Sequence, residues 1–185
     1  MAMTARRTAR GFTLIEAMIV VAVVGILAVI GGVAYQKWIR TSYMAEAQDM
    51  LAQIRTAEET FRAENGAYLQ ISPALDPPNM YPAPTPGAFK TAWGLACATC
   101  VRPWSALNIE PKGALSFGYA VITDTPTNAA PPAIVVNGAA VDLSAITAPW
   151  YIAEAVADVN GDGVFTKVYG FSNGGGHLLV DHEGE

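Results

Sequence analysis

The chain has 185 residues, and its 16 acidic residues against 11 basic ones give a formal net charge of −5 at pH 7. This length accommodates one domain and a long helix. An acidic balance argues against strong non-specific binding of nucleic acid, because such binding depends on Lys and Arg neutralising phosphates. The sequence contains no Ser/His/Asp set, phosphate-binding glycine loop or paired-carboxylate pattern, so we expect a protein that is not an enzyme.

The first element expected is a helix that spans a membrane. Ala17–Gln36 contain no charged residue, and a bilayer is crossed by a helix of about 20 apolar residues. The arginines before this run, Arg6, Arg7 and Arg10, predict that the N-terminus stays in the cytoplasm. Glu16 stands at the start of the run, and a carboxylate in hydrocarbon is costly unless it is paired. Glu16 therefore needs a partner.

Residues 11–16 read Gly-Phe-Thr-Leu-Ile-Glu and lead directly into the apolar run. This segment resembles the class III signal of type IV pilins and the related pseudopilins. The resemblance implies that prepilin peptidase cleaves between Gly11 and Phe12 and that the new N-terminus, Phe12, is methylated. It also implies an assembly role for Glu16, whose carboxylate would neutralise the terminal amine of a neighbouring subunit. A secretory signal has a shorter apolar run, and a plain membrane anchor has no use for Glu16.

The helical pattern continues beyond the apolar run. Thr41–Glu64 contain no proline or glycine, and apolar residues recur there at the spacing of one helix face. Asn65 and Gly66 supply a stop, because both residues tolerate the left-handed conformation that ends helices. We therefore expect one helix from about Thr13 to Glu64, apolar all round in its first half and amphipathic in its second. Unlike many pilins, the first half has no proline; its Gly31-Gly32 pair suits either a flexible segment or close helix packing.

A globular head is expected at residues 65–185. Its first part, residues 70–112, is rich in proline and is expected to be an irregular loop. Residues 113–185 are expected to form an antiparallel sheet, because they alternate between strand-like runs and turn residues. The expected strands are 114–123, 150–158, 164–171 and 177–181, with a small hairpin formed by 133–136 and 139–143.

The expected fold class is α+β. A long N-terminal helix, with an apolar membrane-spanning half and an amphipathic half, packs on an antiparallel β-sheet head, as the resemblance to type IV pilins implies. The chain then divides into a leader at 1–11, the helix at 12–64 and the head at 65–185, with residues 12–36 as transmembrane segment and filament core. Removal of the leader, which holds three arginines and no acid, lowers the formal net charge to −8.

The two cysteines, Cys97 and Cys100, form a Cys-x-x-Cys pair in the proline-rich segment. A head outside the cytoplasm favours a disulfide. A thioredoxin-like role needs a βαβ setting that the pattern lacks, and haem attachment needs a histidine where Val101 stands. We therefore expect a structural disulfide.

The only candidate metal site is the run Asp158-Val159-Asn160-Gly161-Asp162-Gly163, which matches the first half of a calcium loop. Asp158, Asn160 and Asp162 would supply oxygen ligands. The twelfth position is Tyr169 where such a loop has glutamate, so Asp181, Glu183 or a loop carbonyl would have to supply the missing oxygen, with the last strand returning beside this turn. The alternative is a turn rich in residues that accept positive φ, which we favour. No other cofactor is expected.

The resemblance implies a structural subunit of a type IV pilus that polymerises through its N-terminal helix into a helical homo-oligomer. Its partners would be prepilin peptidase and the inner-membrane pilus assembly machinery, and the filament would serve adhesion, twitching motility or DNA uptake. The chain would lie in the inner membrane before assembly and in an extracellular pilus afterwards. Alternatives are a pseudopilin of a type II secretion system and a membrane-anchored calcium-binding interaction module. A periplasmic thiol oxidoreductase has only the cysteine pair in its favour.

Overall fold

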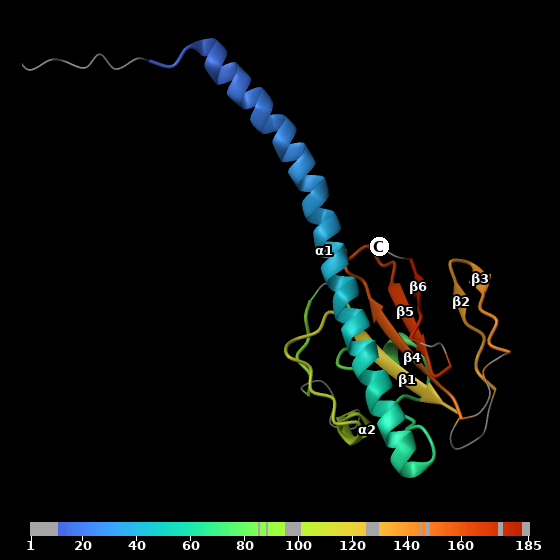
Figure 1. The fold of residues 1–185 in the computed structure, drawn as a ribbon. Helices are drawn as coiled ribbons and strands as arrows, with labels where there is room; N and C mark the ends of the chain where they lie inside the picture. The colour runs from blue at the N-terminus through green and yellow to red at the C-terminus, as the bar shows by residue number, and fades with distance from the viewer. Residues whose placement is uncertain are drawn as a thin grey trace, which may run out of the picture. The chain divides into compact units, whose positions relative to one another are not determined.

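The computed structural model describes residues 11–84, 86–87, 89–94, 101–124, 130–144, 146, 149–173 and 176–182. The chain divides into two compact units, one ending at Ile39 and the other beginning at Arg40. Its main elements are one long helix, a short helix and a set of antiparallel strands (Figure 1). The α+β class predicted from the sequence is therefore confirmed.

Helix α1 runs from Leu14 to Asn65 and contains 52 residues. Both ends agree with the prediction to within one residue. The C-terminal end is formed by Gly66, which has a φ of +81° and whose N–H donates to the Arg62 carbonyl at 2.8 Å. A left-handed glycine immediately after the last helical residue is a common helix stop.

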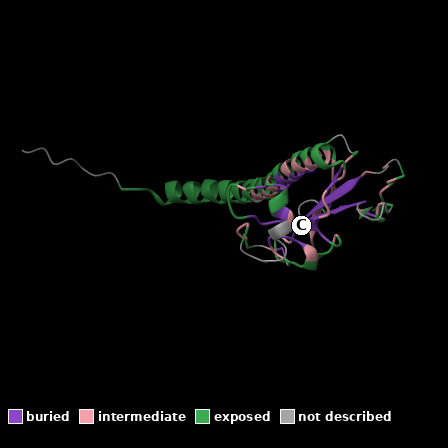
Figure 2. Ribbon diagram, turned by 90° about the horizontal axis from the view of Figure 1, so that it is seen from below, coloured by how far each residue is buried: buried purple, intermediate pink, exposed green. Residues whose placement is uncertain are grey.

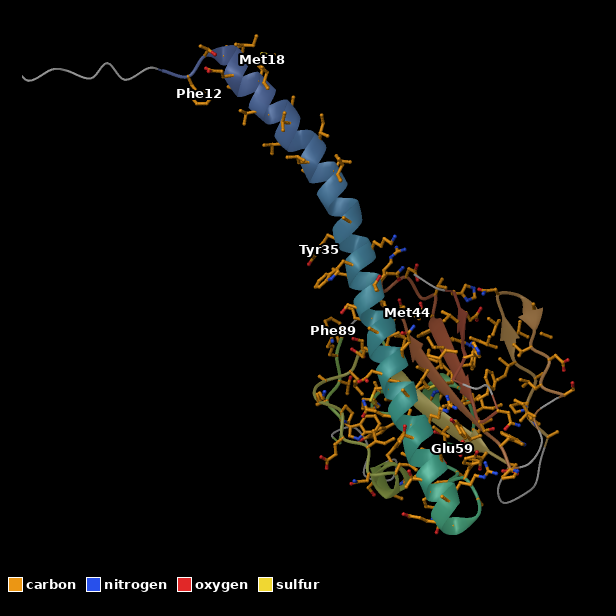
Figure 3. The ribbon with its side chains drawn as sticks, in the orientation of Figure 1. Phe12, Met18, Tyr35, Met44, Glu59 and Phe89 are labelled. Carbon is orange, nitrogen blue, oxygen red and sulfur yellow. The ribbon has the colours of Figure 1, made fainter. Side chains whose placement is uncertain are left out.

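The first unit contains the apolar half of α1. Every side chain from Leu14 to Gly32 is exposed, and Figure 2 shows this part of the helix in the colour of exposed residues. In Figure 3 the labelled side chains of Phe12, Met18 and Tyr35 project from the chain; their exposed fractions are 80%, 63% and 62%. In the described part of the chain, α1 is the one helix long and apolar enough to cross a membrane.

The second unit contains a four-stranded antiparallel sheet in the order β1-β4-β5-β6. The strands are β1 (Gly118–Thr123), β4 (Tyr151–Ala157), β5 (Thr166–Phe171) and β6 (Leu178–Asp181). Strands β4 and β5 form the predicted hairpin, and a separate hairpin joins β2 (Val135–Val136) to β3 (Ala139–Ala140) around Asn137-Gly138, as predicted. Each strand lies within the stretch predicted for it.

One face of the sheet packs against the amphipathic half of α1. Four helix residues at helical spacing are at most 3% exposed: Ala47, Met50, Leu51 and Ile54. They belong to the same apolar cluster as Tyr119 and Val121 of β1 and the alanines of β4. Because side chains alternate along a strand, every second residue faces the helix, and the small alanines of β4 leave room for it.

The opposite face of the sheet, called here the outer face, carries a second apolar cluster. Its members are Ile122, Ile134, Trp150, Ile152, Tyr169 and Phe171. The β2–β3 hairpin contributes Val136 to this cluster and contacts β6. Both faces of the sheet are thus covered, which explains why all of β1 and β4 is buried.

The prediction that residues 70–112 form only an irregular loop is wrong in part. A short helix, α2 (Val101–Ala106), and a 3-10 turn, Pro77–Asn79, lie within it. Helix α2 tolerates Pro103 because the N–H groups of a helix's first turn have no intrahelical partner. The segment is held by three packed aromatic rings, Tyr81, Trp93 and Trp104, whose centroids lie 4.6 to 5.9 Å apart.

Candidate functional site

The predicted cleavage point lies in an exposed, non-helical stretch. Gly11, Phe12 and Thr13 precede the first residue of α1, and all three are exposed. Exposed backbone next to a helix start is accessible to a peptidase. Residues 1–10 of the predicted leader lie outside the described residues, and the cleavage stays a prediction.

The carboxylate of Glu16 closes the first turn of α1. Its Oε2 accepts hydrogen bonds from the Thr13 N–H at 2.8 Å and from the Thr13 hydroxyl at 2.7 Å, while the Glu16 N–H donates to the Thr13 hydroxyl at 3.3 Å. This reciprocal arrangement is a capping box, which satisfies N–H groups that a helix start leaves without partners. This role of Thr13 was not predicted, although a Thr three residues before a Glu at a helix start is the sequence signal for a capping box.

The predicted disulfide cannot be placed on the fold, because Cys97 and Cys100 lie outside the described residues. The described helix α2 begins at Val101, immediately after Cys100. The cysteine pair stays a predicted structural disulfide.

The structure brings Asp158, Asn160 and Asp162 together in the connection between β4 and β5. The two oxygens of Asp158 accept from the N–H groups of Gly161 at 2.7 Å and Gly163 at 3.0 Å. Asp162 accepts from the Val164 N–H at 2.7 Å and from the Asn160 amide at 2.8 Å, and these two bonds lower the pKa of Asp162. These carboxylates thus act as acceptors for the loop's own donors.

Asp181, one of the groups that could supply a further ligand, has other partners in the described structure. The Oδ1 atom of Asp181 accepts from the Asn137 N–H at 2.6 Å and lies 3.2 Å from Nδ1 of His182. Glu183 lies outside the described residues. Among those residues, no group of three or more His, Cys, Asp or Glu side chains is arranged to hold a metal ion. The geometry is that of a side-chain-stabilised turn, and calcium binding stays a hypothesis.

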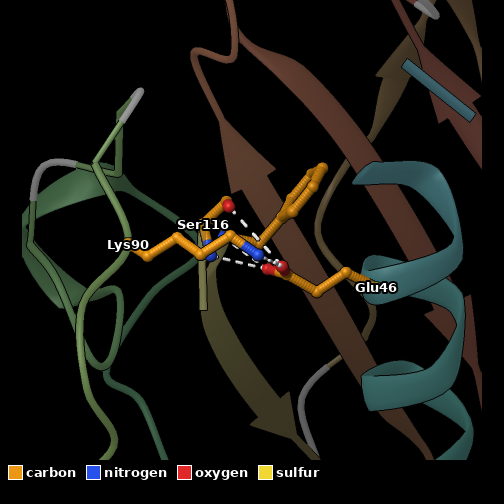
Figure 4. A network of polar contacts seen from close by, with 4 residues as sticks. Glu46, Lys90 and Ser116 are labelled. Atoms are coloured by element: carbon orange, nitrogen blue, oxygen red, sulfur yellow. Dashed lines mark hydrogen bonds and ion pairs between the residues drawn. The ribbon is translucent and has the colours of Figure 1, made fainter. Parts of the chain in front are cut away.

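Glu46 forms a polar network that sequence analysis missed (Figure 4). Its Oε1 accepts from the N–H groups of Ser116 at 2.6 Å and Phe117 at 3.3 Å. Its Oε2 accepts from the Lys90 ammonium at 3.1 Å. Strand β1 begins at Gly118 and not at the predicted residue 114, and the two N–H groups held by Glu46 lie immediately before it.

Two other glutamates are fully buried in the head. Glu58 of α1 is 0% exposed, and its Oε2 accepts from the Leu69 N–H at 2.9 Å. Glu154 of β4 is 1% exposed and is hydrogen-bonded by the Tyr169 hydroxyl. Burial raises the pKa of each to about 7, because a low-dielectric surrounding disfavours the charged carboxylate. The helical periodicity could have identified Glu58, which lies four residues after the buried Ile54.

Comparisons with known proteins find similarity to type IV fimbrial and pilin proteins. Residues 6–32 match the profile of the prokaryotic N-terminal methylation motif. The type IV major fimbrial protein FimA of Dichelobacter nodosus is 51% identical over 51 residues, which are 28% of this chain and 33% of that protein. The type IV major pilin protein PilA of Myxococcus xanthus is 46% identical over 59 residues, 32% of this chain and 27% of that protein.

A longer match is found with the prepilin peptidase-dependent protein D of Escherichia coli, which is 33% identical over 87 residues, 47% of this chain and 58% of that protein. The chain spans about a third of the length of the first curated relatives that it matches. No solved structure matches it significantly. The matched family motif lies at residues 6–32.

Proposed function

We propose that this chain, which belongs by its N-terminal methylation motif and helix to the type IV pilin and pseudopilin family, is a structural subunit of a type IV pilus filament. The observation that carries the proposal is the first half of α1. Its side chains from Leu14 to Gly32 are exposed, and it is apolar enough to cross a membrane. An apolar surface of this size requires either lipid or neighbouring subunits around it.

The proposed pathway begins at the inner membrane. Prepilin peptidase would remove residues 1–11 and methylate Phe12, and the assembly machinery would then transfer the helix from lipid into the filament. The finished pilus would lie outside the cell and serve adhesion, twitching motility or DNA uptake. In both surroundings the apolar half of α1 stays away from water, so the transfer needs no large change in its solvation.

The Glu16 carboxylate is proposed to guide the new N-terminus of a neighbouring subunit. An ionised carboxylate offers about four acceptor positions, and the described bonds to Thr13 use only Oε2. The remaining capacity suits the methylated amine, and pairing the two charges removes the cost of holding either one alone in an apolar filament core.

Intact-mass measurement of sheared surface fibres tests the proposal. We expect the subunit to begin at N-methyl-Phe12. A Gly11→Val variant should accumulate as uncleaved precursor, whereas the matched control Gly32→Val, a glycine within α1, should still be cleaved. A subunit that starts elsewhere would contradict the proposal. A correctly processed subunit that never appears in fibres would favour a pseudopilin of a type II secretion system.

A further inference from the structure

A cavity of about 740 Å³ lies on the outer face of the head's sheet. Its floor includes Ile122 of β1, Glu154 of β4 and Tyr169 of β5, and its walls include residues 73–75 and 132–135. Volumes of 300 to 1,000 Å³ with apolar walls and a few convergent polar groups are typical of sites for small molecules. Neither the filament role nor the processing steps use this cavity.

A buried carboxylate with unused bonding capacity lines the cavity. Glu154 stands between Ala120 and Tyr169 in the sheet register, and its Oε2 has no hydrogen-bond partner. The Tyr169 hydroxyl donates one hydrogen bond to this carboxylate. A buried polar atom without a partner costs free energy that a ligand donor would recover. The cavity therefore favours a ligand that brings a hydrogen-bond donor to Glu154.

The charges around Glu154 favour a positively charged donor. Lys167 lines the cavity and is the largest single charge acting on Glu154, but it forms no ion pair with Glu154 within 4.0 Å in the described structure. Asp76 and Asp181 both act on Glu154 as like charges. Counted with Glu154 itself, the ionised groups here are three carboxylates and one ammonium, so an added ammonium group gains more at this position than a hydroxyl does.

The remaining walls are suited to an apolar body. Leu75, Ile134 and Trp150 line the cavity and belong to, or pack on, the outer-face cluster. We propose that this cavity binds a small organic amine, with its ammonium group on Oε2 of Glu154 and its apolar part against Ile134 and Trp150.

Calorimetric titration of the full chain in detergent micelles tests this with two probes of matched shape, benzylamine and benzyl alcohol. Benzylamine is expected to bind, and benzyl alcohol to bind about tenfold or more weakly, because a charge-assisted hydrogen bond is about twice as strong as a neutral one. Equal affinities for the two probes, or no binding of benzylamine at millimolar concentration, would overturn the proposal.

Variants locate the site within the head. Glu154→Gln keeps the size of the side chain and should weaken benzylamine binding by about tenfold or more. Glu58→Gln, which changes the other buried glutamate away from the cavity, should leave binding unchanged and controls for partition of the probe into micelles. Lys167→Met removes a like charge from the site and should tighten binding by a few fold. Wild-type affinity in a folded Glu154→Gln protein, checked by thermal melting, would refute the assignment.

The pH dependence provides an independent measurement. The titratable and charged groups that act on Glu154 are Tyr169 and Lys167 on β5, Asp181 on β6 and Asp76, which lies between α1 and β1. Because the pKa of Glu154 lies at about 7, benzylamine affinity should rise as the pH is raised from 6 to 8 while the amine stays protonated. Binding at pH 6.5 should also release a proton. An affinity that does not change over this range would contradict the proposed contact with Glu154.

Discussion

The two halves of helix α1 have the same backbone geometry and opposite surroundings. In the first half, large apolar side chains such as Ile15 and Val29 are 65% and 70% exposed. In the second half, Met50 and Ile54 are 2% and 0% exposed because the sheet covers them. The head therefore buries its own apolar residues, whereas the first half depends on lipid or on neighbouring subunits. Substitutions in the first half should then change filament assembly, and substitutions in the second half should change the stability of the head.

The largest effect is expected at Glu16, and it should fall on assembly alone. Glu16→Val should lower the amount of surface fibre by about a hundredfold or more, since leaving one partner of a buried ion pair alone costs about 3–5 kcal/mol. Membrane insertion and the melting temperature of the head should not change. Quantification of sheared fibres against total cellular subunit measures this.

A second substitution separates the charge of Glu16 from its capping role. Glu16→Gln keeps an acceptor for the Thr13 N–H, because Gln also completes a capping box, but it removes the charge. If assembly needs the charge, Glu16→Gln should lower the amount of surface fibre as much as Glu16→Val does. Normal fibres from Glu16→Gln cells would show that the cap, and not the pairing with an amine, is required.

The next largest effect is expected at Glu46, in the second half of α1, and it should fall on the stability of the head. Glu46→Ala leaves the N–H groups of Ser116 and Phe117 without their acceptor, and it should destabilise the head by about 2–4 kcal/mol. The control Lys90→Met removes only the exposed end of the network and should cost less than about 1 kcal/mol. Chemical denaturation of the full chain in detergent measures both. Equal losses for the two variants would contradict the assigned role of the backbone contacts.

The sequence predicted local elements well and long-range polar contacts poorly. The bounds of α1 follow from its uninterrupted apolar pattern and from Gly66, and the β2–β3 hairpin follows from Asn137-Gly138. All of these signals lie within a few residues of the element they define. The Glu46 network joins residues 70 positions apart in the chain, and the burial of Glu154 depends on which strand becomes central in the sheet. No local pattern contains that information.

A smaller, pH-dependent effect is expected from the two buried glutamates. The pKa of Glu58 and of Glu154 is about 7 in the folded head and about 4.3 for an unfolded Glu. Between these values the folded state holds protons that the unfolded state releases, so the stability of the head should fall as the pH rises from about 4.5 to 7. Glu58→Gln or Glu154→Gln should raise the unfolding free energy at pH 8 by about 1–3 kcal/mol.

The same substitutions should have little effect at pH 4.5, where the wild-type carboxyls are already neutral. Glu64→Gln, in the exposed last turn of α1, is the matched control and should change stability at neither pH. Denaturant titrations at the two pH values measure all three variants. An equal stabilisation at pH 4.5 and pH 8 would show that the gain does not come from removing a buried charge.

The smallest effect is expected from calcium. If Asp158, Asn160 and Asp162 held the ion, binding would stabilise the head by about 2.7 kcal/mol at a hundredfold excess over Kd. In the described loop, however, both oxygens of Asp158 accept N–H groups from Gly161 and Gly163, and Asp181 is engaged by Asn137. These bonds stabilise the turn without an ion. We therefore expect the melting temperature of the full chain in detergent to be the same in millimolar calcium and in chelator. A rise of several degrees that Asp158→Ala/Asp162→Ala abolishes would instead establish a calcium site, because a turn held only by its own hydrogen bonds has no reason to respond to the ion.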